Sequence, residues 1–116
     1  MKGRNKYGAK KATRGGRTYD SQAERAYSDL LRLRQKAGEV AFWLEQVPLR
    51  LQGGTVYRLD FLVFERGEGD VFELRWVDVK SPATAKESTF RVKKREIEAL
   101  YGITIECLDK HGREVK

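Results

Sequence analysis

Residues 56–64 read VYRLDFLVF and residues 72–80 read FELRWVDVK, and these two stretches decide the fold of the chain. Both are rich in β-branched and aromatic side chains, which is typical of β-strands. Two glycines lie in the short segment 66–70 between them, which favours a turn. The sequence therefore predicts a β-hairpin whose strands run over residues 55–65 and 71–80.

Working outward, Gly53-Gly54 predicts a second hairpin turn that joins the pair to a strand over residues 40–52. Pro48 lacks a backbone donor, so that strand is expected at a sheet edge. Helical spacing of apolar residues predicts helices over residues 20–37 and 88–101, with residues 81–87 as a loop and 103–108 as a last short strand.

The expected order is α-β-β-β-α-β, an α/β fold of the mixed α+β kind. Two hairpin links make three strands antiparallel, and the second helix returns the chain in a right-handed crossover to a parallel fourth strand. We therefore expect a mixed four-stranded sheet flanked by helices.

Positive charge is concentrated at the start of the chain. The formal net charge is +7, and residues 1–17 carry seven basic and no acidic side chains, so the rest of the chain is balanced. We expect a flexible basic arm over residues 1–19, one folded domain over 20–109 and a polar tail over 110–116. A polyanion is the expected partner of such an arm, and a solubilising tail is the alternative.

Several classes are excluded on composition. No apolar run is long enough to cross a bilayer, and no apolar stretch follows the first charges as in a signal peptide. Cys107 and His111 each occur once, which excludes an internal disulfide and His-rich zinc sites and fits a reducing, cytoplasmic location. Any chemistry must come from carboxylates, Lys and an oxygen-bound metal.

Asp60 and the pair Asp78 and Lys80 are the strongest candidates for that chemistry. Each aspartate lies on an otherwise mostly apolar strand face, the first formed by alternate residues from Val56 to Phe64. If both faces look into the core, the carboxylates repel and need a cation, for which Mg²⁺ or Mn²⁺ is suited. With Lys80 holding a phosphate oxygen or a water, the group suits phosphodiester hydrolysis. An Asp–Lys ion pair at a strand end is the structural alternative.

Three further residues are candidates with open alternatives. Glu24 either completes a capping box with Ser21 or faces the sheet and reaches the metal. Lys93 and Lys94 fall on the apolar side of the second helix, so that one of their heads can touch a phosphate near the site; a solvated helix face is the alternative.

The order of elements with Glu24, Asp60 and Asp78-Val79-Lys80 resembles the PD-(D/E)XK nuclease superfamily. Asn5-Lys6-Tyr7-Gly8-Ala9-Lys10-Lys11, followed by Tyr19-Asp20-Ser21, resembles a group of small phage-encoded nucleases that are similar to archaeal-type Holliday junction resolvases. Leu59 departs from the pattern, which has Pro before the Asp.

The resemblance implies a metal site of Glu24, Asp60 and Asp78, with Lys80 orienting the attacking water. It also implies a homodimer, because a four-way junction is cut on two opposing strands. Gln46 lies where related nucleases carry a supporting polar residue. For DNA contacts we name the basic and aromatic residues of the arm and the second helix: Lys6, Tyr7, Lys10, Lys11, Arg14, Arg17, Lys93 and Lys94.

The leading hypothesis is a Mg²⁺-dependent, structure-selective DNA endonuclease, a Holliday junction resolvase acting in recombination, in the host cytoplasm if phage-encoded. A restriction-type or nicking endonuclease on duplex DNA is the second hypothesis. A non-catalytic, basic nucleic-acid-binding module is the third. The sequence does not separate the first two.

Overall fold

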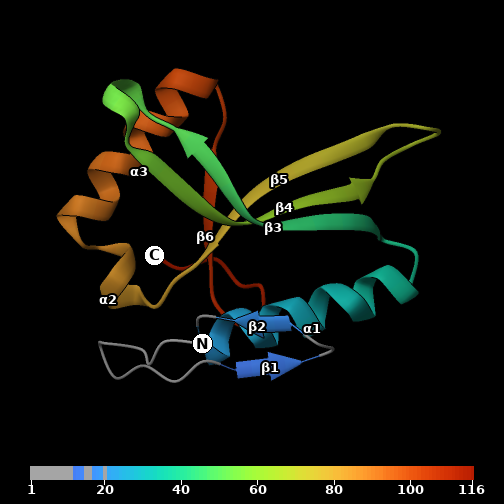
Figure 1. Ribbon diagram of the computed structural model, residues 1–116. Helices are drawn as coiled ribbons and strands as arrows, with labels where there is room; N and C mark the ends of the chain where they lie inside the picture. The colour runs from blue at the N-terminus through green and yellow to red at the C-terminus, as the bar shows by residue number, and fades with distance from the viewer. Residues whose placement is uncertain (1–11, 15–16, 20) are drawn as a thin grey trace.

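The computed structural model describes residues 12–14, 17–19 and 21–116 of the chain, and side chains from residue 21 onward. Its elements follow one another as in Figure 1: β1 (Ala12–Arg14), β2 (Arg17–Tyr19), α1 (Gln22–Lys36), β3 (Val40–Arg50), η1 (Gln52–Gly54), β4 (Val56–Arg66), β5 (Phe72–Val79), α2 (Pro82–Ala85), α3 (Ser88–Tyr101) and β6 (Ile105–Leu108).

The main sheet has the order β3-β4-β5-β6, with the first two pairs antiparallel and β5 parallel to β6. The expected mixed four-stranded sheet is therefore confirmed, and Pro48 lies in an edge strand as expected. Gly102, in the left-handed region at φ 68°, ends α3 and turns the chain back toward β6.

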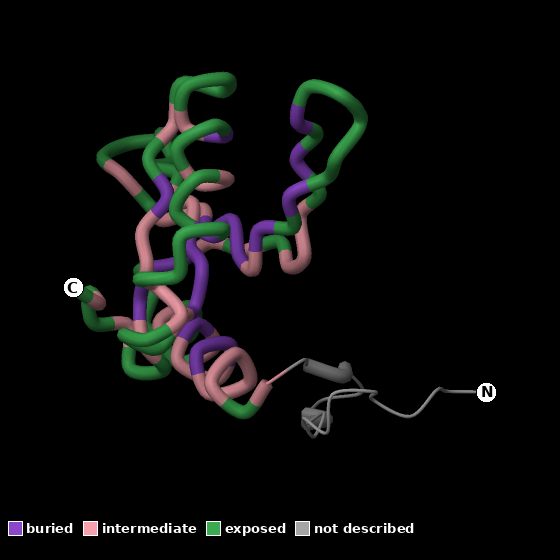
Figure 2. Tube along the Cα trace, turned by 90° about the vertical axis from the view of Figure 1, so that its left-hand side faces the viewer, coloured by how far each residue is buried: buried purple, intermediate pink, exposed green. Residues whose placement is uncertain are grey.

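Two apolar clusters hold helices to opposite sides of the sheet (Figure 1). Tyr27 and Leu31 of α1 pack with Phe61 and Val77 in the first cluster. In the second, α3 packs against β6 and against the turn end of the β3–β4 hairpin, through residues that include Phe90, Ile97, Leu49, Tyr57, Leu59 and Ile105. Figure 2 shows this hairpin end opposite α3, with its buried residues on the side toward the helix.

The prediction for the faces of β4 was wrong in part. Val56 and Arg58 are exposed, whereas Tyr57, Leu59, Phe61 and Val63 are buried. The alternation also changes at Asp60: Leu59 packs in the α3 cluster, and Phe61 packs in the α1 cluster. Simple period-two alternation fails because the hairpin bends at this point to cover both helices. Asp60 is half-buried at the bend.

Three smaller differences concern the connections. Residues 82–85 of the expected loop form the short helix α2, which Ser81 and Thr84 cap reciprocally. The strand expected to reach residue 52 ends at Arg50, and η1 forms the turn from Gln52. The tail folds back on the body, since Val115 N–H donates to the Cys107 carbonyl over 2.9 Å.

Within residues 1–19, expected as an arm, β1 and β2 pair antiparallel and contact α1. The rest of that segment, and the expected helix start at Asp20, lie outside the described residues. In the described part of the chain, no helix is long and apolar enough to cross a membrane.

Among the residues that the structure describes, no helix covers one end of the sheet on the face that α3 covers elsewhere. Phe42 stacks on Phe64 with ring centroids 4.2 Å apart, and Phe72 meets both rings edge-on. Leu44 and Leu74 follow Phe42 and Phe72 on the same face by strand alternation. We call these five residues the open sheet face; all but Phe64 are more than 40% exposed.

Candidate active site

Asp60 and Asp78 lie where β4 and β5 separate. The backbone pairing of these strands ends at Phe61 and Val77. At the next position of each strand, carboxylate oxygens accept hydrogen bonds in place of backbone carbonyls. The Asp60 N–H donates to Asp78 Oδ1 over 3.0 Å, and the Val79 N–H donates to Asp60 Oδ2 over 2.9 Å. The two aspartates predicted to meet are thus brought together, and each is fixed by a backbone donor of the other strand's segment.

Asp78 is almost fully enclosed, with 2% of its surface exposed. Besides the Asp60 N–H, it accepts a hydrogen bond at Oδ2 from the Tyr57 hydroxyl. Burial raises the pKa of the Asp78 carboxyl, while the Tyr57 hydroxyl, the Asp60 N–H and the charges of Lys80 and Lys94 oppose the rise. The carboxylate therefore sits where negative charge is disfavoured and a nearby cation stabilises it.

The same negative charge acts on its neighbours. Burial, followed by the charge of Asp78, raises the pKa of the Tyr57 phenol, so that Tyr57 stays a neutral donor. Burial and the Asp78 charge also raise the pKa of the Cys107 thiol. Cys107 is thereby kept a thiol rather than a reactive thiolate.

Lys80 extends β5 into the site. Its backbone N–H donates to the Leu108 carbonyl over 2.9 Å, which ties the position to β6. Its ammonium lies 4.3 Å from the ring centroid of Phe90, a cation–π contact with α3. An Asp–Lys ion pair was the structural alternative for this motif; among the described residues, the Lys80 head contacts an aromatic ring and forms no ion pair.

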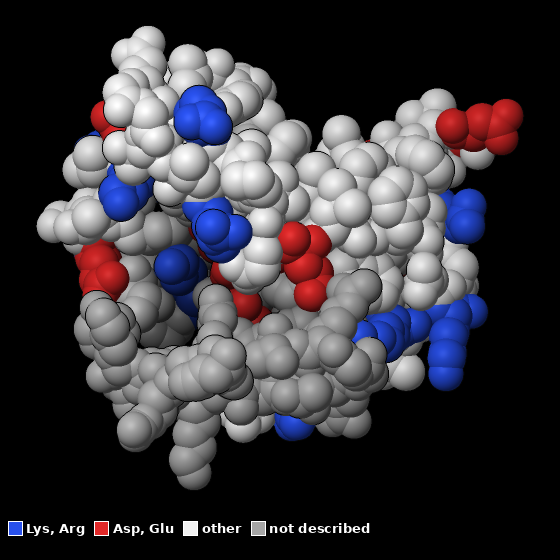
Figure 3. Space-filling model, in the orientation of Figure 1, with Lys and Arg blue, Asp and Glu red and all other residues white. Residues whose placement is uncertain are grey.

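Asp60, Asp78 and Lys80 share one hollow of about 280 Å³ between β4, β5 and the start of α3. Tyr57, Arg58 and Lys93 also line it. We call this the Asp60–Asp78 hollow. Figure 3 shows acidic side chains exposed near the middle of this view of the molecule, with basic side chains around α3 to their left.

Glu24 lies in a neighbouring hollow of about 520 Å³, which Lys80 also lines. Ser21 caps α1 by accepting from the Glu24 N–H over 3.1 Å, while the Glu24 carboxylate accepts from Gln46 Nε2 over 3.2 Å. The carboxylate thus points toward β3 rather than only toward its own helix start. Lys80 stands between the two hollows, because it lines both.

The two lysines of α3 differ. Lys94 is paired with Glu98 over 3.0 Å, and Glu98 also accepts from the Ile105 N–H. Lys93 lines the Asp60–Asp78 hollow instead. Lys93 is thus the one of the two that lines the hollow, while Lys94 acts on Asp78 through its charge.

Arg14 and Arg17 are backbone partners in the pairing of β1 with β2, and their side chains lie outside the described part of the structure. Lys6, Tyr7, Lys10 and Lys11 lie outside the described residues. The role assigned to the arm in DNA contact therefore stays a prediction.

Sequence reasoning missed Tyr57 and undervalued Gln46. In the sequence, Tyr57 is not distinguished from the other aromatic residues of the strands. Only the pairing of β4 with β5 shows that its hydroxyl donates a hydrogen bond to Asp78. Gln46 adopts a positive φ of 54° inside β3, between Glu45 and Val47, which pair with Phe61 and Leu59 in one continuous register. A backbone conformation that non-glycine residues rarely adopt often marks a functional position, and nothing in the sequence signals it.

A comparison with protein-family models found no match, and comparisons with curated proteins and with solved structures found none either.

The donor set at the Asp60–Asp78 hollow fits a hard divalent cation, because carboxylate oxygens are what Mg²⁺ and Mn²⁺ prefer. Each carboxylate oxygen of Asp78 accepts one of these hydrogen bonds with one lone pair and has a second lone pair for a cation. Among the described residues, no three His, Cys, Asp or Glu side chains already stand together as a metal cage. Glu24 is thus not gathered with the two aspartates as the resemblance implied.

Proposed function

We propose that this protein is a metal-dependent DNA endonuclease that selects branched DNA, as a Holliday junction resolvase does, and acts in the cytoplasm. The observation that carries the proposal is the pair of aspartates interlocked at the separation of β4 and β5, with Lys80 and Lys93 lining the same hollow. A hollow that is lined by both carboxylates and cations suits the negative phosphate and the metal that hydrolysis of a phosphodiester requires.

Each residue has a distinct role in this proposal. Asp60 and Asp78 hold Mg²⁺ or Mn²⁺, which when bound polarises the phosphate and lowers the pKa of a water. Lys80 orients the attacking water or a phosphate oxygen, and its ring contact with Phe90 limits where its head can move. Lys93 contacts a phosphate of the strand. Tyr57 is a positioning residue that fixes the rotamer of Asp78.

Glu24 is the third metal ligand in this proposal, and its hollow adjoins that of the aspartates at Lys80. Its carboxylate is oriented by Gln46, and Lys80 lines both its hollow and that of the two aspartates. The test of this role is separate from that of the aspartates, because Glu24 lies on a different element.

The deciding experiment compares cleavage of matched four-way junction, flap and linear DNA, with and without Mg²⁺, by the wild type and by Asp78→Asn. We expect junction cleavage that needs both Mg²⁺ and Asp78, while DNA binding by the variant is kept because it loses one negative charge near phosphates. Binding that ignores Mg²⁺ and Asp78, with no cleavage, would instead indicate the non-catalytic module. Linear duplex cut as fast as the junction would indicate a restriction-type or nicking enzyme.

We include a homodimer in the proposal, formed through the open sheet face. Monomeric proteins rarely leave a contiguous cluster of aromatic side chains in water. The cluster consists of apolar residues, so a second copy can meet it by two-fold symmetry without burying like charges. Two copies would present two sites to the two strands of a junction.

A further inference from the structure

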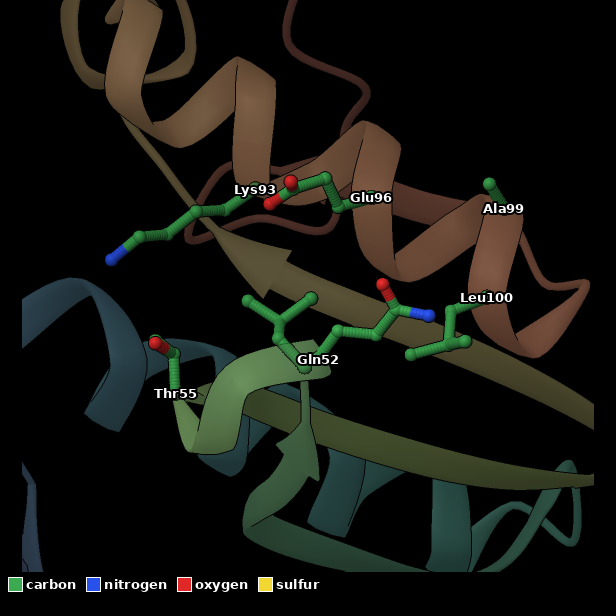
Figure 4. Close-up of a pocket in the computed structure, with 7 residues that line it drawn as sticks. Gln52, Thr55, Lys93, Glu96, Ala99 and Leu100 are labelled. Atoms are coloured by element: carbon green, nitrogen blue, oxygen red, sulfur yellow. The ribbon is translucent and has the colours of Figure 1, made fainter.

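A third hollow, of about 470 Å³, lies between the η1 turn and the last turns of α3 (Figure 4). Its lining includes Leu51, Gln52, Thr55, Lys93, Glu96 and Leu100. We call it the η1 pocket. Figure 4 shows Gln52 of the turn extending toward Leu100 of the helix and Lys93 extending toward the Thr55 side, while Ala99 points away from the turn. Its volume falls in the range of small-ligand sites.

The walls of the η1 pocket are held before any ligand arrives. The Tyr101 hydroxyl donates to the Arg50 carbonyl over 2.8 Å and ties the end of α3 to the start of the turn. Within the turn, the Leu51 N–H donates to the Thr55 carbonyl over 2.7 Å. Gly53 and Gly54 take the positive φ values that this tight closure requires. A preformed site loses little ordering entropy when it binds.

The η1 pocket continues from the Asp60–Asp78 hollow, because Lys93 lines both. If one phosphate of a DNA strand lies at Asp60 and Asp78, the next phosphate of that strand therefore lies near the ammonium of Lys93. The nucleoside attached there is directed to the space between η1 and α3. The pocket thus lies where the strand next to the cut would place one base.

The lining fits a nucleobase. Leu51, Ala99 and Leu100 offer apolar surface to the faces of a ring. The Gln52 amide both donates and accepts, and the Glu96 carboxylate accepts from the N–H groups that every base carries on its pairing edge. In a duplex that edge is occupied by the partner base and the faces are stacked, so only an unpaired base can present both.

We propose that the η1 pocket binds one unpaired nucleobase of the DNA beside the cleaved phosphate, and so gives the protein its preference for DNA with unpaired nucleotides over perfect duplex. This inference rests on the proposed function in that it takes DNA as the substrate. It names the feature of branched DNA that this site reads.

The test measures binding by the full chain carrying Asp78→Asn, without divalent metal, so that nothing is cut. Two labelled DNAs of one sequence are compared, one fully paired and one with a single unpaired nucleotide. We expect about tenfold tighter binding of the second, the scale of one well-placed base contact. Ala99→Trp, which adds a large ring at an exposed residue of the pocket lining, should remove the preference and leave affinity for the paired DNA unchanged.

Ala37→Trp is the matched control, the same exchange at an exposed position at the other end of the molecule, and it should keep the preference. Glu96→Ala is a milder second variant, to be used if Ala99→Trp lowers the melting temperature. It should weaken binding of the DNA with the unpaired nucleotide and leave binding of the paired DNA unchanged. Equal affinity for the two DNAs, or a preference that survives both pocket variants, overturns the inference.

Failure of this inference is distinguishable from failure of the proposed function. If the wild type cuts DNA in a manner that needs Asp78 but shows no preference in binding, only the pocket assignment is wrong. If the preference exists and vanishes with Ala99→Trp while no DNA is ever cut, the pocket assignment holds and the nuclease proposal is wrong.

Discussion

Removal of the Tyr57 hydroxyl tests the interior of the proposed site. Tyr57 is 7% exposed and Asp78 is 2% exposed, so Tyr57→Phe deletes a buried hydrogen bond to a carboxylate without creating a large cavity. Asp78 keeps the Asp60 N–H as a donor. Hydrogen bonds to charged groups contribute about 1.5–3 kcal/mol, so we expect the free energy of unfolding to fall by about that amount near neutral pH.

The loss should depend on pH, and its sign follows from the pKa of Asp78. Burial raises that pKa in the fold, so the charged carboxyl costs stability above its unfolded pKa, and this cost disappears as pH falls and the group is protonated. The Tyr57 hydrogen bond lowers the pKa, and without it the pKa rises further. The effect of Tyr57→Phe should therefore be largest at neutral pH and shrink toward about 0.5–1.5 kcal/mol, the range for a neutral hydrogen bond, in acid.

Urea unfolding from about pH 4 to about pH 8 measures this effect. Tyr101→Phe is the matched control, because it deletes a hydroxyl that donates to the Arg50 carbonyl at a residue that is 42% exposed. A double-mutant cycle with Asp78→Asn isolates the interaction between the two side chains. If Tyr57→Phe costs no more than Tyr101→Phe, or if the cycle shows no coupling, Tyr57 does not position Asp78.

Three further predictions concern Glu24, the basic segment and the open sheet face. Glu24→Gln should leave the melting temperature nearly unchanged, because Ser21 caps α1 through the backbone N–H, but should strongly reduce cleavage if the carboxylate binds metal; retained cleavage contradicts that role. Removing residues 1–11 deletes five basic and no acidic residues and keeps the paired strands β1 and β2. The slope of log DNA affinity against log salt concentration should therefore flatten by about two to four. An unchanged slope would show that this segment does not bind DNA. Phe72→Lys should convert the dimer into monomers, as measured by light scattering. Leu33→Lys, at an exposed position of α1, should leave the dimer intact. A wild-type protein that is already monomeric contradicts the dimer.

Much of the fold could be predicted because it depends on local patterns. Glycine pairs and runs of β-branched residues marked the hairpins, and Pro48 marked the edge strand. Ser21 and Gly102 marked the helix ends, since caps and left-handed turns require particular residue types. The pairing of Asp60 with Asp78 followed from the same patterns, because a hairpin with a known turn brings defined residues side by side.

The sequence by itself determined the order of the elements, the mixed sheet and the meeting of Asp60 with Asp78 and Lys80. Tertiary structure alone decided the bend at Asp60, where β4 changes which residues it buries because the hairpin must cover both α1 and α3. It alone brought the Tyr57 hydroxyl to Asp78, directed Gln46 to Glu24, and separated Lys93 in the site from Lys94 in an ion pair. These contacts join residues on different elements, and their geometry depends on how strands twist and separate, which no local pattern records.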